Sequence, residues 1–330
     1  MAESDRRTFL KQGALLGGGL VLGGLYGGAV EGKVSKSKIV ISRDEGPRKG
    51  VEEGATDRIG RLLDRGMEVL FGGPADEVWR SLAGPGDTVG LKVNCLSGKR
   101  MSTRSALVWA IVKRLERVGV ERNRIVIWDR MNSHLKRAGY KINVGGSDVQ
   151  CYGTDAVGYD NRLIGYGEVG SLFSRILVDQ CSKIVNLPVL KDHGICGVTL
   201  GMKNFFGAIH NPNKYHDHAG DPYIADLNAL PMIQEKTNLT VVDGITAQYE
   251  GGPPYMPQWT WDFNGLLLGL DPVALDYTGW QIIERKRAEK GLPALKEASP
   301  TRAPTYIATA ADAHHRIGTN DPKRMDVVTV

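Results

Sequence analysis

The residues best suited to chemistry gather in segment 184–220. Four of the seven histidines and three lysines fall in it: His193, His210, His216, His218, Lys191, Lys203 and Lys214. The segment continues from a predicted strand that ends at Pro188, and ligands of α/β sheets bind outside the carboxyl ends of the strands. The clustering therefore favours a functional site here. The alternative is a set of polar loop histidines that bind nothing.

Metal binding is the first interpretation of this segment. Imidazole is the commonest side-chain ligand of zinc, copper, iron and nickel in proteins. The His216-x-His218 spacing on an extended segment puts both rings on one side, and His193-x-x-Cys196 has ligand-like spacing that is weak by itself. The predicted metal ligands are His193, His210, His216 and His218.

Anion binding is the second interpretation. Glycines at 194, 197 and 201 surround Thr199, and glycines let backbone N–H groups approach a phosphate or carboxylate to which lysine adds charge. The standard phosphate loop, G-x-x-x-x-G-K-[ST], is absent. The predicted cofactor-binding residues are Lys92, Asn94, Thr199, Lys203 and Asn204.

Acidic residues at later strand ends are candidates for proton transfer. Asp243 ends a predicted strand and Glu250 follows it in a loop, so both carboxylates are expected near the histidine segment if the sheet is parallel. The alternative for both residues is a glycine-rich turn without a chemical role, and a helix cap explains Asp271. We predict Lys191 and Asp243 as the catalytic pair, with Asp243 acting as a base or orienting another group.

The four cysteines argue against an iron–sulfur cluster built by this chain. Cys95, Cys151, Cys181 and Cys196 form no C-x-x-C pair, whereas iron–sulfur and structural zinc sites usually contain one. Disulfides and buried free thiols both remain open.

Alternating strand-like and helix-like runs position these residues. We predict strands at 37–42, 88–93, 124–128, 183–187, 239–243 and 265–269, helices at 57–71, 103–118 and 272–290, and a last strand at 325–328. This order is typical of an α/β fold with a mostly parallel sheet and helices on both faces. Residues 129–170 are expected to form an irregular glycine-rich insertion.

Composition and charge exclude several protein classes. The chain has 330 residues, is 42% hydrophobic and carries a formal charge of +5. It is too apolar for a disordered polymer, and no basic stripe interleaved with aromatics indicates nucleic acid as a partner.

The N-terminal 30 residues have the features of a twin-arginine export signal. Arg6-Arg7 precedes Phe9-Leu10-Lys11, and an uncharged, glycine-rich run follows to Val30. We predict a signal peptide or anchor at 1–30 and one large α/β domain at 31–330. The expected partner is the twin-arginine translocase, and the expected location is the periplasm or a tethered state on the outer side of the cytoplasmic membrane.

These motifs together resemble the family called domain of unknown function 362. The resemblance spans about residues 85–330, from Lys92-Val93-Asn94 through Asn186-Leu187-Pro188 and the 191–207 stretch to the runs at 242–245 and 270–276. Many members are joined to, or lie beside, ferredoxin-like iron–sulfur modules, whose C-x-x-C-x-x-C run is missing here. The resemblance favours these positions without assigning them catalytic roles: Lys191, His193, Thr199, Lys203, Asn204, Asp243, Asp271 and Asp276.

The leading hypothesis is an exported protein that binds a metal ion or a small anionic ligand at this segment, in a redox context. One alternative is a metal-independent enzyme acting on a phosphorylated or carboxylated small molecule. Another is a non-enzymatic accessory that docks with a redox partner protein.

Overall fold

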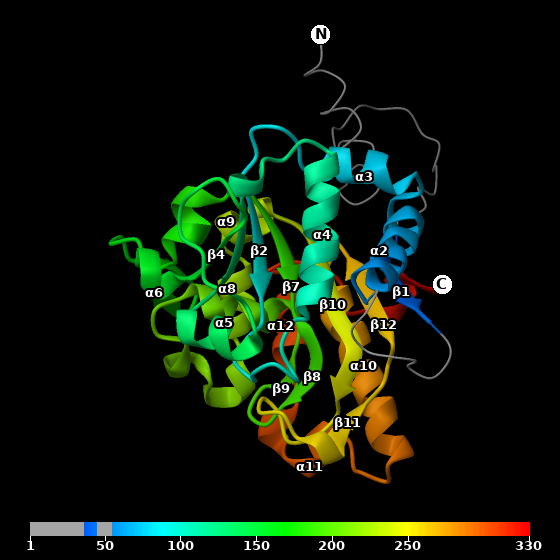
Figure 1. Cartoon of the computed structure of the whole chain (residues 1–330). Coiled ribbons are helices and arrows are strands. Elements are labelled where there is room, and N and C mark those ends of the chain that lie inside the picture. The colour runs from blue at the N-terminus through cyan, green and yellow to red at the C-terminus, as the bar shows by residue number, and fades with distance from the viewer. Residues whose placement is uncertain (1–35, 45–54) are drawn as a thin grey trace, which may run out of the picture.

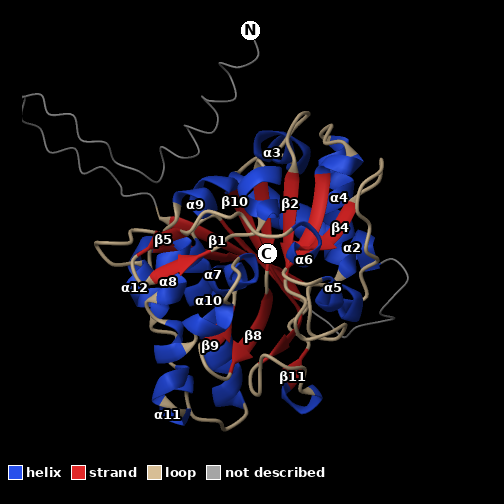
Figure 2. Cartoon of the chain, turned by 90° about the vertical axis from the view of Figure 1, so that its left-hand side faces the viewer, coloured by secondary structure: helices blue, strands red, loops and turns tan. Residues whose placement is uncertain are grey.

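The structure is a computed structural model that describes residues 36–44 and 55–330. The predicted export signal lies outside the described residues. Strands gather at the centre of the molecule with helices around them (Figures 1 and 2).

The main sheet is mixed and mostly parallel, as predicted. In the described part of the chain, eight strands follow the order β13-β1-β12-β10-β7-β2-β3-β4; β8 and β11 pair with β10, and β9 pairs with β8. Among the described residues, six of the ten strand pairs in this sheet are parallel. The strands are β1 (Ser37–Arg43), β2 (Val89–Val93), β3 (Ile125–Asp129), β4 (Gln150–Gly153), β7 (Lys183–Leu187), β8 (Val189–His193), β9 (Gly197–Thr199), β10 (Thr237–Gln248), β11 (Thr260–Trp261), β12 (Gly265–Gly269) and β13 (Met325–Thr329).

Helices cover both faces of the sheet, because the buried strands are apolar on both sides. In β3, Ile125 and Ile127 belong to one hydrophobic core, whereas Val126 and Trp128 belong to the other. The first core is covered by α2 (Ala55–Phe71), α3 (Ala75–Leu82) and α4 (Ser105–Arg117). The second is covered by elements that include α7 (Gly201–Asn204), α8 (Tyr223–Asn228), α9 (Pro231–Lys236), α10 (Pro272–Glu289), α11 (Leu295–Ala298) and α12 (Tyr306–Ala310).

The predicted N-terminus of the long C-terminal helix is confirmed. Asp271 caps α10 by accepting hydrogen bonds from the backbone N–H groups of Val273 and Ala274, and Pro272 takes the first helical position. Such a cap satisfies N–H groups that the helix itself leaves unpaired.

The segment 129–170 is more regular than expected. It contributes β4 to the main sheet, in parallel with β3, and also forms α5 (Asn132–Ala138), α6 (Thr154–Val157) and a hairpin of β5 (Ile164–Tyr166) and β6 (Val169–Ser171). The strand β4 has only four residues, too few to show a periodic pattern in the sequence.

The segment after Pro188 is also more ordered than a loop. It begins with the β8–β9 hairpin and continues through α7 and three short helical turns, η3 (Phe205–Ala208), η4 (Pro212–Tyr215) and η5 (Asp217–Gly220). Strand β10 runs past the expected end at residue 243 because β8 pairs with its second half.

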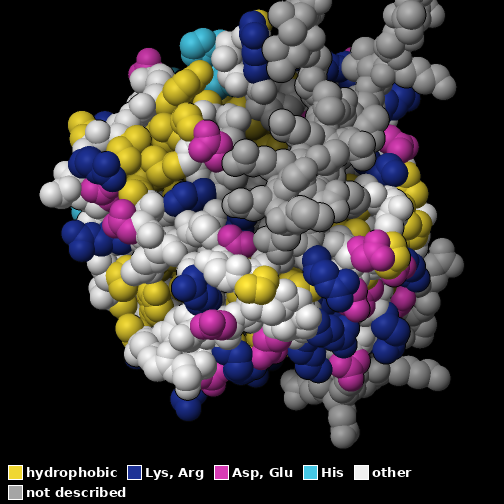
Figure 3. Space-filling model, turned by 90° about the horizontal axis from the view of Figure 1, so that it is seen from above, with side chains coloured by type: hydrophobic (Ala, Val, Ile, Leu, Met, Phe, Trp, Pro, Cys, Tyr) yellow, Lys and Arg dark blue, Asp and Glu magenta, His cyan; other side chains and the backbone are white. Residues whose placement is uncertain are grey.

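Within the residues that the structure describes, no helix is long and apolar enough to cross a membrane. On the face seen from above, lysine and arginine side chains alternate with aspartate and glutamate (Figure 3).

Candidate functional site

Three parallel strands end side by side at one edge of the sheet and bring predicted residues together. Lys92 of β2 lies opposite Trp128 of β3 and Asn186 of β7. Lys92 and Asn186 are buried, as is Asp129, the residue after Trp128. The carboxyl edge therefore carries polar groups deep in the molecule, where each needs a partner.

A continuous hydrogen-bond network satisfies these groups, with Asn204 of α7 at its centre. The Asn204 amide donates to Asn186 Oδ1 at 2.8 Å and accepts from Asn94 Nδ2 at 3.2 Å and from Lys92 Nζ at 3.4 Å. Asn94 Oδ1 in turn accepts from Lys191 Nζ at 3.0 Å. Four of the predicted site residues, Lys92, Asn94, Lys191 and Asn204, thus belong to one network.

Lys92 has a charged partner inside the molecule. Its Nζ lies 2.8 Å from Asp129 Oδ1, and both side chains are almost fully buried. The other carboxylate oxygen of Asp129 accepts from the backbone N–H of Cys95 at 2.8 Å. Gly207 passes close to this pair, and a Cβ there would lie 2.7 Å from Asp129 Oδ1. A side chain at 207 would therefore force the ion pair to shift.

Lys191 has only neutral partners. Its Nζ donates to Asn94 Oδ1, to Ser97 Oγ at 2.7 Å and to the Met101 carbonyl at 3.2 Å. Burial lowers the pKa of Lys191 to about 8, because desolvation disfavours the charged ammonium.

Asp243, the second predicted catalytic residue, holds the backbone before α4. Its Oδ2 accepts from the Arg104 N–H at 2.8 Å and its Oδ1 from the Ile245 N–H at 3.2 Å. The carboxylate is buried, and Arg104 Nε lies 3.6 Å away. These contacts give Asp243 a positioning function at the N-terminus of α4.

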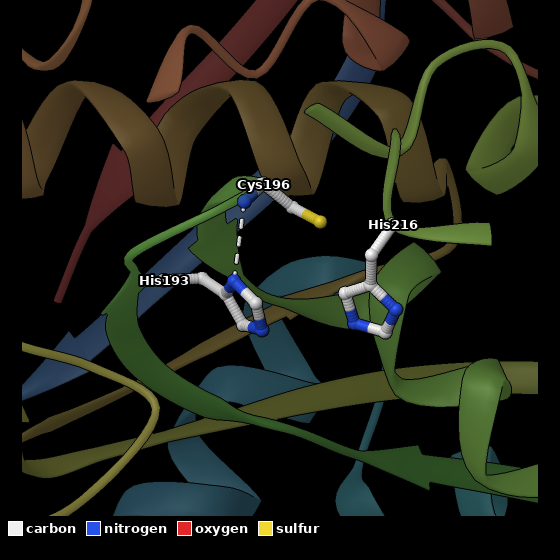
Figure 4. A group of neighbouring side chains, drawn as sticks. All are labelled: His193, Cys196 and His216. Carbon is white, nitrogen blue, oxygen red and sulfur yellow. Dashed lines mark hydrogen bonds between the residues drawn. The ribbon is translucent and has the colours of Figure 1, made fainter. Parts of the chain in front are cut away.

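A second group of side chains could hold a metal ion. One ligand atom from each of His193, Cys196 and His216 lies within 4.8 Å of the others. Figure 4 shows His193 at the end of β8, Cys196 in the turn after it, and His216 on a separate segment facing them. Two nitrogens and one sulfur are a donor set suited to zinc or copper.

Hydrogen bonds assign the tautomers of the two imidazoles. His216 Nδ1 lies 2.9 Å from the Pro212 carbonyl and donates to it, which leaves a lone pair on Nε2. His193 Nδ1 accepts from the Ile195 and Cys196 N–H groups at 3.2 and 3.1 Å, which puts its proton on Nε2. A metal ion at His216 Nε2 would take the place of Lys203 Nζ, which lies 2.9 Å from that nitrogen, and a metal ion at either nitrogen of His193 would end its two weak hydrogen bonds.

Lys203 lies against this group. Its Nζ is 2.9 Å from His216 Nε2 and 3.8 Å from the centre of the Phe206 ring. Burial lowers the pKa of Lys203 to about 8. Burial and the charge of Lys203 lower the pKa of His216 to about 4, and the same two causes, in that order, lower the pKa of His193 well below its usual value. Both imidazoles are therefore neutral at neutral pH.

The family follows from a match that covers more than half of the chain. The family model described as Domain of unknown function (DUF362) matches residues 89–281. The chain belongs to this family. The matched range includes the hydrogen-bond network, Lys203 and all three residues of the potential metal site.

Other comparisons add little about this DUF362 protein. A crystal structure of a protein from Thermotoga maritima, solved as a structural genomics target, is similar to it at 11% identity, with 73% of this chain covered and a TM-score of 0.37. This chain spans about three fifths of that protein, since 59% of it is covered. No curated protein matches this chain.

The structure separates the four predicted histidine ligands of this DUF362 protein. His193 and His216 belong to the group in Figure 4, which includes neither His210 nor His218. His210 and His218 are exposed, and His210 packs edge-on against Tyr159 at 5.2 Å between ring centres. Thr199 lies opposite Lys191 in the β8–β9 hairpin and is buried.

The predicted site residues do not include Cys196, Asp129 or Asn186. The His193-x-x-Cys196 spacing was the signal for Cys196. All four cysteines are free and buried, and they form no cluster.

Two further acids that the sequence singled out have structural partners. Asp276 accepts from the N–H groups of Gly201 and Met202 at 2.7 and 3.1 Å, which fixes the start of α7. Glu250 pairs with Arg287 and Arg302.

Proposed function

We propose that this DUF362 protein binds a transition-metal ion, with Zn²⁺ the first to test, through His193, Cys196 and His216. The observation that carries the proposal is the convergence of three ligand atoms within 4.8 Å of one another, from two separate segments. A contraction of about 1 Å would bring them to the spacing of ligands around a metal at 2.0–2.3 Å.

Three protein ligands, the number found in the described part of the chain, support a catalytic or transport site more than a closed structural one. Structural zinc sites have four protein ligands, whereas sites with three keep a position open for water or substrate. His216 Nδ1 donates to the Pro212 carbonyl, which is the outer-shell bond that orients most histidine ligands of metals.

We also propose that the protein acts outside the cytoplasmic membrane after export by the twin-arginine translocase. The support is the sequence of residues 4–11 and the uncharged run after it. Because this route carries folded proteins, the metal would enter before export.

Direct metal analysis tests the function. We expect the full-length protein to bind one Zn²⁺ per chain in competition with a chromophoric chelator. His216→Ala and Cys196→Ser should each weaken binding by at least about 100-fold, since even outer-shell changes cost about 10- to 100-fold.

The matched controls are His210→Ala and His218→Ala, two histidines of the same segment that lie outside the group. They should bind Zn²⁺ like the unaltered protein. Absence of stoichiometric binding, or equal losses in all four variants, would reject the metal site.

A further inference from the structure

Two buried lysines near the potential metal site form no ion pair in the described part of the chain. Lys203 is 6% exposed and its polar partner is His216, while Lys191 is fully buried among neutral oxygens. Lys92, by contrast, is paired with Asp129. A buried ammonium without a counter-ion is costly, so an anion is expected beside it.

The charges around His193 add to the same preference for an anion. Lys203 and Lys191 both act on His193 as positive charges, whereas Arg302 is already paired with Asp192 and Glu250. The electrostatic surroundings of His193 therefore favour a negative ligand.

A bound metal ion increases this need. Zn²⁺ and one Cys196 thiolate leave a net charge of about +1, and the Lys203 ammonium, displaced from His216 Nε2 by the metal ion, would stay beside it as a further positive charge. Burying that much charge of one sign is unfavourable unless a further ligand neutralises it.

We infer that the substrate supplies a small oxyanion, a carboxylate or a phosphate, which binds the metal ion at its open position and accepts a hydrogen bond from Lys203. The inference rests on the proposed metal function. It assigns Lys203 as an anion-binding residue, and the Phe206 ring, 3.8 Å from its ammonium, restricts where that group can move.

Cobalt-loaded full-length protein provides the test, because the visible spectrum of Co²⁺ reports its ligands. We expect sodium acetate, sodium phosphate or both to change the spectrum saturably, and the comparison of the two distinguishes carboxylate from phosphate. Lys203→Met should lower the affinity for the anion by at least about tenfold, the usual loss for a charge-assisted hydrogen bond. Lys203→Arg, which keeps the charge, should bind the anion with an affinity between those of Lys203→Met and the unaltered protein.

Lys214→Met is the matched control, since Lys214 is an exposed lysine of the same segment. A Co²⁺ spectrum that neither anion alters would overturn this inference and leave the metal site intact, whereas failure to bind Co²⁺ at all would reject the metal site itself. Equal anion affinity in metal-free protein, measured by calorimetry, would also overturn the inference, because the anion would then bind without the metal.

Discussion

At the scale of single residues, the lysines at the sheet edge differ in what compensates their charge. Lys92 is neutralised by Asp129 at 2.8 Å, and both side chains are almost fully buried. Removing one partner of such a pair leaves the other charge buried and costs about 3–5 kcal/mol of stability. We predict that Lys92→Met lowers the free energy of unfolding by roughly 3 kcal/mol in urea denaturation.

The surface supplies the comparison for this residue. Lys113 and Asp57 also form an ion pair, but their side chains are 52% and 71% exposed. Lys113→Met should change stability by less than about 0.5 kcal/mol. Similar losses of stability in both variants would show that the buried Lys92–Asp129 pair contributes no more to stability than an exposed ion pair.

At the scale of elements, His315 ties α8 to the turn after α12. Its Nε2 lies 2.8 Å from Asp226 of α8, and its Nδ1 lies 3.0 Å from Asp312. Burial lowers the pKa of His315, but the hydrogen bonds and charges of the two carboxylates outweigh burial and raise it above its usual value. The folded state therefore holds the imidazolium proton more tightly than the unfolded chain does.

The sign of the pH effect follows from this shift. The stabilisation is fully present below the unfolded pKa, about 6.5, and is lost as pH rises through the higher folded pKa. We predict that His315→Gln destabilises the protein more at pH 6 than at pH 9, as measured by urea denaturation at both values. The exposed neighbour His314 gives the control, and a His315→Gln loss independent of pH would contradict the assignment.

At the scale of the whole molecule, a metal ion would connect the β8–β9 hairpin to the segment between η4 and η5. Ligands that bind only the folded state stabilise it by about 2.7 kcal/mol at 100 times Kd. We predict that Zn²⁺ raises the Tm of the full-length chain by several degrees, that a chelator reverses the rise, and that His216→Ala abolishes it. A Tm rise that persists in His216→Ala would show that Zn²⁺ acts elsewhere.

Local patterns were sufficient for the family, for the three long helices and for most of the longer strands. Short runs of apolar and β-branched residues, such as 183–187, predict strands without information from the rest of the chain. The Asp271-Pro272 cap is likewise a local hydrogen-bond motif. The 191–207 stretch identified the family for a similar reason, since its residues are adjacent in the chain. Where the local pattern was short, as in β4, the sequence was not informative.

Only the tertiary structure decided which polar groups meet. Lys92 of β2 and Asn204 of α7 are 112 positions apart, and they meet where α7 packs against the carboxyl edge of the sheet. His193 and His216 face each other, while His210 and His218 are exposed. The path of the chain through η4 and η5 decides which histidines converge. Spacing along a chain limits which residues can converge. Contacts between distant segments depend on how the whole core packs, because the side chains of a closely packed interior fix one another's positions.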